Sequence, residues 1–430
     1  MSTRRGFLGA LGLPLVAPAA ALRLDRAGSP GFELPAGTGD PAVDARDEDF
    51  WGGVAAAFTV DRSMLNLNNG GVSPAPAAVQ EAQRRFLEDA HHAPAYVMWR
   101  KQQPQREYVR AGLARIAGVS AESIALMRNA SEALQTCQFG FDLEPGDEVL
   151  ATDQDYPRML NTFRQRERRD GVVLKTFPIP TPCEDPGEIV RRYRDAITPK
   201  TRLILCCHVI NITGQILPVK EICALGRERG IPVIVDGAHA FANVDFRIAD
   251  LGCDYYATSL HKWLFAPLGT GMLYVAPDKI EGLWPLMAAN PGQEGDIRKF
   301  EEIGTHPIPT QLAIGDAIVF HEWLGAARKE ARLLHLRDTW AKRLLAHDRV
   351  RLNTSLAPGV ACGIANVRID GVESGKLASW LLREHRIVVT TIQHDDFEGI
   401  RVSPSVYTTL GELDRFCEAM EHVVREGLPA

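Results

Sequence analysis

Short apolar runs alternate with longer amphipathic stretches through much of this chain. Continuous apolar runs are typical of strands that are buried on both faces of a parallel sheet. The runs that fit this description are residues 149–151, 172–174, 203–205, 233–235 and 272–275. Stretches of helical character separate them, and this alternation predicts an α/β fold whose large, mostly parallel sheet is covered by helices.

The pattern changes at both ends of this region. Residues 22–47 are rich in Gly, Pro, Ala and Asp, which predicts an irregular arm, and residues 311–345 have apolar positions at helical spacing. Strands are expected at residues 363–369 and 387–391, and a last helix at residues 413–424. The predicted organisation is a signal segment at 1–21, an N-terminal arm at 22–65, a large domain at 66–310, and a bridging helix with a smaller α+β C-terminal domain at 311–430.

Two of the predicted strands place polar side chains at one edge of the sheet. The apolar run at residues 231–235 ends at Asp236, and residues 255–259 lead into a loop that contains Lys262. Open α/β sheets bind ligands beyond the carboxyl ends of their strands, so we expect the carboxylate and the amine to share a site. Pyridoxal 5′-phosphate needs both groups, because a lysine forms a Schiff base with its aldehyde and an acid keeps its pyridine nitrogen protonated.

Further segments resemble, in family order, those of fold-type I pyridoxal-phosphate enzymes, within them aminotransferase class V, and more narrowly the isopenicillin N epimerase-like branch. The matching segments are residues 128–132 at the phosphate, 153–156 over the cofactor ring, 208–214 near the cofactor 3-oxygen, 304–305 lent to the phosphate of a second subunit, and 401–403 around a carboxylate-binding arginine. The resemblance covers most of the chain from about Asn66 onward. It implies a homodimer whose active sites lie at the subunit interface.

The resemblance also implies roles for individual residues. Lys262 and Asp236 are expected to be catalytic, and Arg401 is expected to bind the substrate carboxylate. The residues expected to bind the cofactor are Ala130, Ser131, Tyr156, Asn211, Asp236, His239, Ser259, His261, Lys262 and, from the neighbouring subunit, Thr305.

Several of these assignments have an ordinary structural alternative. Ala130 and Ser131 directly precede a predicted helix start at residues 132–137, whose free N–H groups and dipole suit a phosphate, although capping residues are common at any helix start. Asn211 and His239 are candidates for hydrogen bonds to the cofactor phenolate oxygen, but Asn211 also fits a turn before the glycine that follows. Arg401 offers a fixed-charge fork suited to a carboxylate, while most arginines are solvated surface groups.

The resemblance implies that the substrate amino group displaces Lys262 to form an external aldimine, after which the free lysine amine moves the α-proton. The sequence leaves the next step open, because epimerisation, transamination and lyase chemistry all follow that proton transfer. Transamination is favoured, since no second base is evident opposite Lys262, where Tyr156 is expected to stack. Tyr156 is itself able to serve as a second acid, which keeps epimerisation in view.

Cysteine usage bears on the lyase alternative. Cysteine desulfurases of this class need a thiol on a mobile loop shortly before the carboxylate arginine, and residues 390–400 contain none. Cys362 lies further upstream, at the entry to a predicted strand, where packing is its expected role. The eight cysteines of the chain lack metal-ligand spacing, so we expect buried thiols rather than disulfides or a metal site.

The N-terminus carries a second signal. Arg4 and Arg5 precede a mildly apolar segment at residues 11–16 and small residues at 17–21 that suit cleavage. This three-part layout indicates a twin-arginine (Tat) export signal, which predicts the Tat translocase as a partner and a periplasmic or exported location. The apolar segment is too short to span a bilayer, so no stable membrane anchor is expected. The combination is similar to that of the periplasmic pyridoxal-phosphate enzyme that tailors the siderophore pyoverdine.

The composition of the chain mainly excludes certain classes of partner. A chain of 430 residues with 45% hydrophobic positions is large enough for two domains, and a net charge of −6 argues against nucleic acid or an anionic membrane as a partner.

The expected function is an aminotransferase-type enzyme whose substrate is an amino acid or a peptidyl amino acid, with an epimerase or a carbon–sulfur lyase as the alternative. A non-catalytic binding protein is a further alternative, which the joint presence of Lys262, Asp236 and Arg401 opposes.

Overall fold

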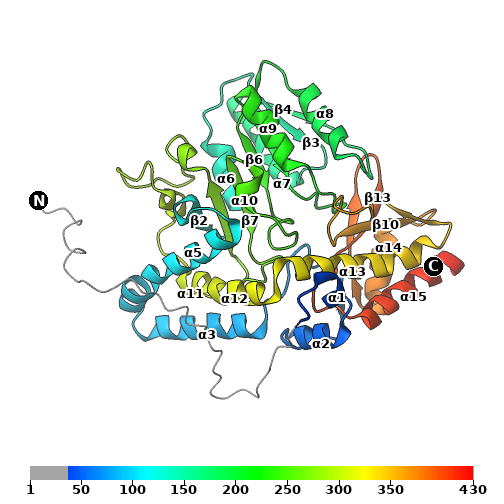
Figure 1. Ribbon diagram of the computed structural model, residues 1–430. Coiled ribbons are helices and arrows are strands. Elements are labelled where there is room, and N and C mark those ends of the chain that lie inside the picture. The colour runs from blue at the N-terminus through cyan, green and yellow to red at the C-terminus, as the bar shows by residue number, and fades with distance from the viewer. Residues whose placement is uncertain (1–36, 430) are drawn as a thin grey trace, which may run out of the picture. The chain divides into compact units, whose positions relative to one another are not determined.

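The structure, a computed structural model, describes residues 37–429, and the predicted signal segment at residues 1–21 lies outside this range. A seven-stranded sheet with the order β2-β8-β7-β6-β5-β3-β4 is its largest sheet (Figure 1). The strands are β2 (Ile124–Met127), β3 (Glu148–Thr152), β4 (Val173–Phe177), β5 (Thr201–Cys207), β6 (Val233–Asp236), β7 (Tyr255–Ser259) and β8 (Gly271–Val275). Neighbouring strands from β4 to β7 pair in parallel, whereas β8 is antiparallel to both of its neighbours. The predicted α/β fold with a mostly parallel sheet is confirmed.

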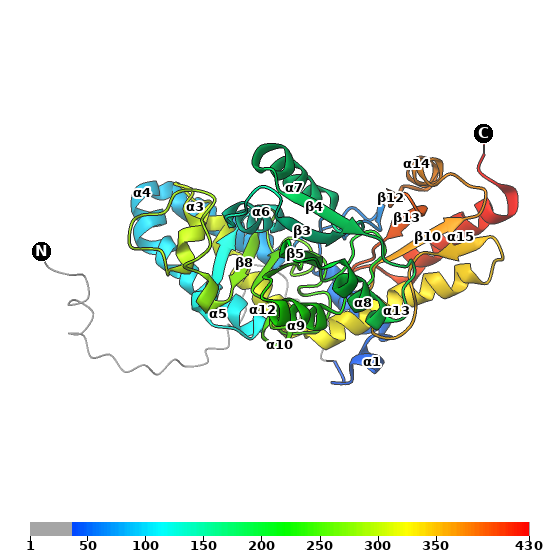
Figure 2. The ribbon, with the colours of Figure 1, turned by 90° about the horizontal axis from the view of Figure 1, so that it is seen from above.

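Helices cover both faces of this sheet (Figure 2). Successive side chains of a strand point to opposite faces, so in β5 Ile204 packs on one side and Leu205 on the other. The core around Ile204 includes α9 (Val219–Arg229), and the core around Leu205 includes α6 (Ala130–Gly140) and α7 (Pro157–Asp170). Apolar residues at consecutive positions are therefore what each strand requires, which is why the strands were predictable.

A second sheet of four antiparallel strands, in the order β12-β13-β10-β9, follows later in the chain. Its strands are β9 (Val350–Leu352), β10 (Ala365–Ile369), β12 (Thr390–Gln393) and β13 (Glu398–Val402). A third core joins this sheet to α14 (Ser374–His385) and α15 (Leu410–Glu426). The strands and the last helix expected in this region are present, with boundaries shifted by a few residues.

The helical prediction for residues 311–345 is confirmed as three helices in place of one. They are α11 (Ile308–Leu312), α12 (Ile314–Leu324) and α13 (Ala326–Leu345). Gly325 separates α12 from α13 with a φ of +80°, a conformation that glycine adopts without the steric penalty of a side chain. The apolar spacing continues across this break, so the pattern alone did not reveal it. In Figure 1, α13 runs past α1 toward α15 and the second sheet.

The expectation of irregular structure at residues 22–47 is wrong at α1 (Pro41–Asp44), which lies within the described part of that segment, residues 37–47. The rest of the N-terminal arm forms α2 (Glu48–Ala56) and leads into β1 (Leu65–Asn66), which pairs in parallel with β11 (Ile387–Val388). The side chains of Asp40 and Asp47 cap the two helices by accepting backbone N–H groups of the first turn. Side-chain capping therefore stabilises these helices despite the high Gly and Pro content of the segment.

The chain also forms α3 (Ala77–His92), α4 (Pro94–Tyr96), η2 (Val97–Gln102), η3 (Gln103–Gln105), α5 (Arg106–Ala117), η4 (Ala121–Ser123), α8 (Pro186–Ala196), α10 (Ile248–Leu251), η5 (Pro277–Lys279) and η6 (Ile297–Glu301). Within residues 37–429, none of the helices has the length and apolar character needed to cross a membrane.

Candidate active site

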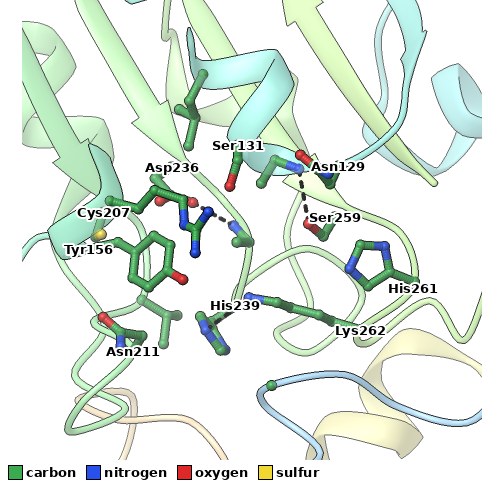
Figure 3. Close-up of a pocket in the computed structure, with 16 residues that line it drawn as sticks. Asn129, Ser131, Tyr156, Cys207, Asn211, Asp236, His239, Ser259, His261 and Lys262 are labelled. Atoms are coloured by element: carbon green, nitrogen blue, oxygen red, sulfur yellow. Dashed lines mark hydrogen bonds between the residues drawn. The ribbon is translucent and has the colours of Figure 1, made fainter. Parts of the chain in front are cut away.

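A cavity of about 220 Å³ opens at the carboxyl ends of the parallel strands (Figure 3). This is the edge at which open α/β sheets bind ligands. The predicted residues that line it are Ala130, Ser131, Tyr156, Asn211, Asp236, His239, Ser259, His261 and Lys262. The structure thus brings together residues from five separate segments of the chain, because each segment follows the end of a strand.

Lys262 and Asp236 reach this cavity from neighbouring strand ends. The Nζ atom of Lys262 lies 3.2 Å from Nε2 of His239 (Figure 3). Burial lowers the pKa of Lys262 to about 8, and the charge of Arg401 adds to this effect while Asp236 opposes it. Burial raises the pKa of Asp236, against the backbone N–H of Ala238 and the charge of Lys262, which both lower it. The cavity therefore favours an uncharged amine and needs a cationic partner for its carboxylate.

The start of α6 forms another wall of the cavity. Asn129 caps the helix, with its Oδ1 accepting from the backbone N–H of Glu132 at 2.8 Å. Ser259, at the end of β7, accepts from the N–H of Ala130 at 2.9 Å, so its hydroxyl lies at the same helix start, and Ser131 lines the cavity beside it. The N–H groups and the dipole of a helix start attract anions, and hydroxyls can donate to the same group. This wall suits a phosphate.

The segment that carries Tyr156 is held by a buried carboxylate. Oδ2 of Asp155 accepts from the backbone N–H and the hydroxyl of Thr152 at 2.7 and 2.8 Å, and Oδ1 accepts from the N–H of Cys207 at 2.8 Å. Burial raises the pKa of Asp155 to about 6, although these hydrogen bonds oppose the shift. Tyr156 follows immediately and precedes α7, with its ring at the cavity. The anchored carboxylate thus sets where the aromatic ring can lie.

Two buried polar atoms at the site have no hydrogen-bond partner among residues 37–429. They are Oδ1 of Asn211 and Nδ1 of His239. Buried polar atoms are nearly always paired in folded proteins, so unpaired atoms at a cavity indicate groups that a ligand satisfies. Together with an amine, a buried carboxylate and a helix start, they fit pyridoxal 5′-phosphate, which presents an aldehyde, a phenolate oxygen, a pyridine nitrogen and a phosphate.

Arg401 lies behind the cavity rather than on its wall. Its side chain is buried, and its two Nη groups donate to the backbone oxygen of Asn211 at 3.0 Å and to Oδ1 of Asn68 at 2.7 Å. Burial lowers the pKa of Arg401 to about 10. A Cβ atom on Gly70 would meet His239 and Ser403 at 3.3 Å, which is a tight contact, so the absence of a side chain there leaves room for the His239 ring.

Thr305 does not line the cavity of its own chain. It is exposed and follows Gly304 in a bend after η6.

Among the residues near the site that were not predicted from the sequence, three have side chains able to take part in polar contacts. Arg158 and Cys207 line the cavity, and Asn68 binds Arg401. Arg158 lies two positions after Tyr156 in the first turn of α7, a spacing that could have suggested it. Cys207 is the last residue of β5, directly before the matched segment at residues 208–214. No local pattern links Asn68 to Arg401.

All eight cysteines are unpaired and buried, which confirms the expectation of buried thiols. Burial raises the pKa of Cys362 to about 11 and holds that of Cys207 well above its ordinary value. Among residues 37–429, no group of His, Cys, Asp and Glu side chains is placed to hold a metal ion.

The fold and this set of donors define an enzyme that uses pyridoxal 5′-phosphate. The family model for aminotransferase class V matches residues 65–416, and the chain belongs to this family. It is 32% identical to isopenicillin N epimerase of Streptomyces clavuligerus, over 87% of this chain and 99% of that protein. It is 29% identical to a probable cysteine desulfurase of Pseudomonas aeruginosa, over 85% of this chain and 95% of that protein.

Solved structures show the same fold. A C-DES mutant with glycine covalently linked to its PLP cofactor gives a TM-score of 0.76 at 23% identity, covering 84% of this chain and 97% of that one. The apo cysteine desulfurase of Thermococcus onnurineus gives 0.77 at 21% identity, covering 87% and 98%. The expected fold type, the class V family, the likeness to isopenicillin N epimerases and the pyridoxal 5′-phosphate cofactor are confirmed.

Proposed function

We propose that this protein acts on the amino group and Cα of an amino acid or of an amino-acid residue in a peptide, with aminotransferase chemistry. The observation that carries the proposal is the convergence of three ionisable side chains on one cavity. Lys262 and Asp236 line it, and Arg401 is close enough to lower the pKa of both Lys262 and His239. They supply an amine for the cofactor aldehyde, a carboxylate for its pyridine nitrogen and a cation for a substrate carboxylate.

Each residue has a separate task in this proposal. Pyridoxal 5′-phosphate, when bound, withdraws electrons from Cα of the substrate and so makes its proton removable. Lys262 removes and returns that proton, because its lowered pKa leaves more of the amine neutral near pH 7 than in an ordinary lysine. Asp236 keeps the pyridine nitrogen protonated, and its burial strengthens that ion pair by excluding water. His239 holds the Lys262 amine within the cavity.

Transamination is proposed because of what surrounds Lys262. The desulfurase route needs a mobile thiol, but β12 and β13 are joined by a short turn at residues 394–397 without cysteine. Cys207 lines the cavity, yet burial keeps it in the thiol form, which is a poor nucleophile. Transamination needs a single base that moves the proton from Cα to the cofactor carbon. Lys262 suffices for that transfer.

Epimerisation is the second candidate. Isopenicillin N epimerases of two actinomycetes, at 32% and 31% identity, are similar along nearly their whole length. Tyr156 also lines the cavity, on an element separate from that of Lys262, and its hydroxyl can donate a proton (Figure 3). Epimerisation requires such a second donor on the opposite face of Cα.

The experiment that separates the two candidates uses the purified holoprotein in D₂O. It is incubated with single amino acids and short peptides while the visible spectrum of the cofactor and the products are followed. Transamination is expected to convert the bound cofactor to its amine form and to release an oxo acid. Inversion at Cα with deuterium incorporated, and without cofactor conversion, would support epimerisation instead. Absence of both from every substrate would contradict the proposed function.

Export through the Tat route and a homodimer are parts of the same proposal. The twin arginines Arg4 and Arg5 support export of a folded protein that has already bound its cofactor. The exposed position of Thr305 supports a second subunit, as do large aromatic side chains that are 54–80% exposed at Tyr96, Trp99 and Tyr108. Exposed aromatic groups of this size are typical of subunit interfaces.

A further inference from the structure

α13 carries a buried amine that the proposed chemistry does not use. Lys329 is fully buried, and its Nζ donates a hydrogen bond to the backbone oxygen of Trp263. The same atom lies 3.9 Å from the centre of the Phe265 ring. Burial holds the pKa of Lys329 well below its ordinary value, and no carboxylate of residues 37–429 opposes this shift. Burying an amine without a counter-charge is unfavourable, so stability alone would favour an apolar residue here.

The carbonyl that Lys329 binds belongs to the loop that presents Lys262. The loop is closed at its base, where Leu260 N donates to Thr270 O at 2.9 Å and Ala266 N donates to Leu260 O at 3.1 Å. Among residues 37–429, no backbone amide donates to the Trp263 oxygen. Lys329 therefore satisfies a buried carbonyl that the loop itself leaves unpaired.

The residue on the other side of Lys262 is anchored as well. The backbone oxygen of His261 accepts from the N–H of Ser73 at 3.2 Å. The peptide group before Lys262 and the one after Trp263 are thus both fixed, one by the N-terminal segment and one by α13. Anchors one peptide before and two peptides after the Lys262 Cα limit the directions in which the lysine side chain can leave the backbone.

The backbone of Lys329 is itself held in place by its neighbours on α13. Arg328 Nε donates to Asp44 at 2.7 Å, and Arg332, which is fully buried, pairs with Glu48. These bonds tie α13 to α1 and α2 on both sides of Lys329. The anchor of the Lys262 loop is therefore attached to a helix that cannot easily slide.

We propose that Lys329 is a positioning residue for Lys262. By holding the Trp263 carbonyl, it keeps the Lys262 amine in the buried cavity beside His239, at the point where it meets the cofactor and substrate. This inference rests on the proposed role of Lys262. Loss of the anchor lets the loop relax toward water, so that the Lys262 amine becomes better hydrated and holds its proton more strongly.

Lys329→Met tests this inference, because it keeps the length of the side chain and removes the donor. Lys329→Gln is the conservative variant, since it retains an N–H donor without charge. Lys299→Met is the matched control: Lys299 is also buried and donates to two backbone carbonyls, at Glu294 (2.9 Å) and Glu281 (3.4 Å), but it does not line the cavity. Lys329→Leu replaces Lys329→Met if the latter does not fold.

The measurement is acetylation of Lys262 in the full-length apoprotein as a function of pH, followed by peptide mass spectrometry, with thermal unfolding in parallel. The wild-type midpoint is expected at about pH 8. Lys329→Met is expected to raise the midpoint by about one unit, which is roughly tenfold slower labelling near pH 7. Lys329→Gln should leave the acetylation midpoint of Lys262 close to the wild-type value. Lys299→Met should lower thermal stability without shifting that midpoint.

An unchanged midpoint in Lys329→Met would overturn the proposal, as would an equal shift in Lys299→Met. Borohydride reduction of wild-type holoprotein separates this outcome from a failure of the proposed function. If the reduced cofactor is on another lysine, the role of Lys262 is wrong, whatever the acetylation midpoints are.

Discussion

The amine of Lys262 faces the imidazole of His239 across 3.2 Å, in a place where neither group is readily charged. Burial holds the pKa of His239 well below its ordinary value, and the charges of Lys262 and Arg401 act in the same direction. A neutral imidazole can share one hydrogen bond with an amine, whereas an imidazolium would repel an ammonium group. Burial therefore favours the neutral lysine, which is the form that attacks an aldehyde, and His239 holds the amine in place.

Capture of pyridoxal 5′-phosphate by the apoprotein should accelerate as the pH rises through about 8. The reacting form is the neutral amine, and the lowered pKa of Lys262 makes about a tenth of it neutral at pH 7, compared with less than about 0.1% of an ordinary lysine. Stopped-flow absorbance between about pH 6 and pH 10 measures the rate, which should level off above about pH 9. A rate that is flat over this range would contradict the assignment, and Lys262→Ala should yield no borohydride-stable adduct.

Asp236→Asn should leave the fold largely intact and remove most of the activity. Within the described part of the chain, the carboxylate accepts one backbone N–H, from Ala238, so a neutral isostere keeps that bond but no longer stabilises a protonated pyridine nitrogen. We expect a loss of about 100-fold in kcat or more, with little change in Tm.

Asp155→Asn is the matched comparison for that variant. Both oxygens of Asp155 accept hydrogen bonds, so an amide would place an NH₂ group against a donor and cost about 1–3 kcal/mol of stability. Thermal unfolding of both variants checks the contrast. Equal turnover in Asp236→Asn and wild type would refute the role of Asp236.

Asn68→Ala should weaken binding of substrates that have an α-carboxylate. Its Oδ1 holds one Nη group of Arg401 at 2.7 Å, and without it that group keeps only a longer bond, 3.4 Å, to Oγ1 of Thr390 within residues 37–429, while the other Nη group stays on the backbone of Asn211. The expected effect is a rise in KM of about 5–10-fold, equivalent to one hydrogen bond, with a smaller change in kcat. Steady-state kinetics with an amino acid and with the matching decarboxylated amine decide it, because an equal rise for both would exclude a role in carboxylate binding.

If Thr305 completes the neighbouring site, a Thr305→Glu subunit and a Lys262→Ala subunit, each inactive with its own kind, should restore activity when they form a mixed dimer. Thr305→Glu would place a carboxylate near the phosphate of the partner's cofactor, and Lys262→Ala removes the amine of its own site. A mixed dimer then contains one intact site, formed by Lys262 of one subunit and Thr305 of the other. We expect co-purified mixed dimers to recover about half of wild-type activity per dimer, and light scattering that shows only monomers would contradict the homodimer.

Arg4→Lys combined with Arg5→Lys should keep the protein in the cytoplasm with its N-terminal segment uncleaved, since the Tat translocase discriminates against paired lysines. Cell fractionation followed by mass determination of the N-terminus checks this. Normal periplasmic accumulation of the double variant would overturn the export prediction.

The parts of the fold that were predictable are those encoded by consecutive residues. Strand β6 is apolar at its first three positions because helices cover both of its faces, and its last position, Asp236, lies at the edge where ligands bind. Lys262 follows β7 in the same way. A local pattern was enough for both, because the geometry of a parallel sheet brings its strand ends together without further information.

The parts that could not be predicted depend on contacts between distant segments. Asn68 and Arg401 are separated by 333 positions, and Lys329 and Trp263 by 66, so no periodicity relates the members of either pair. Gly325 interrupts a helix without interrupting the apolar spacing. Thr305 and the N-terminal signal remain predictions, because one concerns a second subunit and the other lies outside the described residues.

Because all eight thiols are buried, their reactivity reports when the regions around them unfold. A thiol reagent too bulky to enter the folded core reacts only with molecules that have opened, locally or completely. The order in which Cys207, Cys362 and Cys417 become labelled would therefore report when the cavity, the junction before the second sheet and the last helix separate from their neighbours. Unfolding can be timed region by region in the unmodified chain, without introducing a probe.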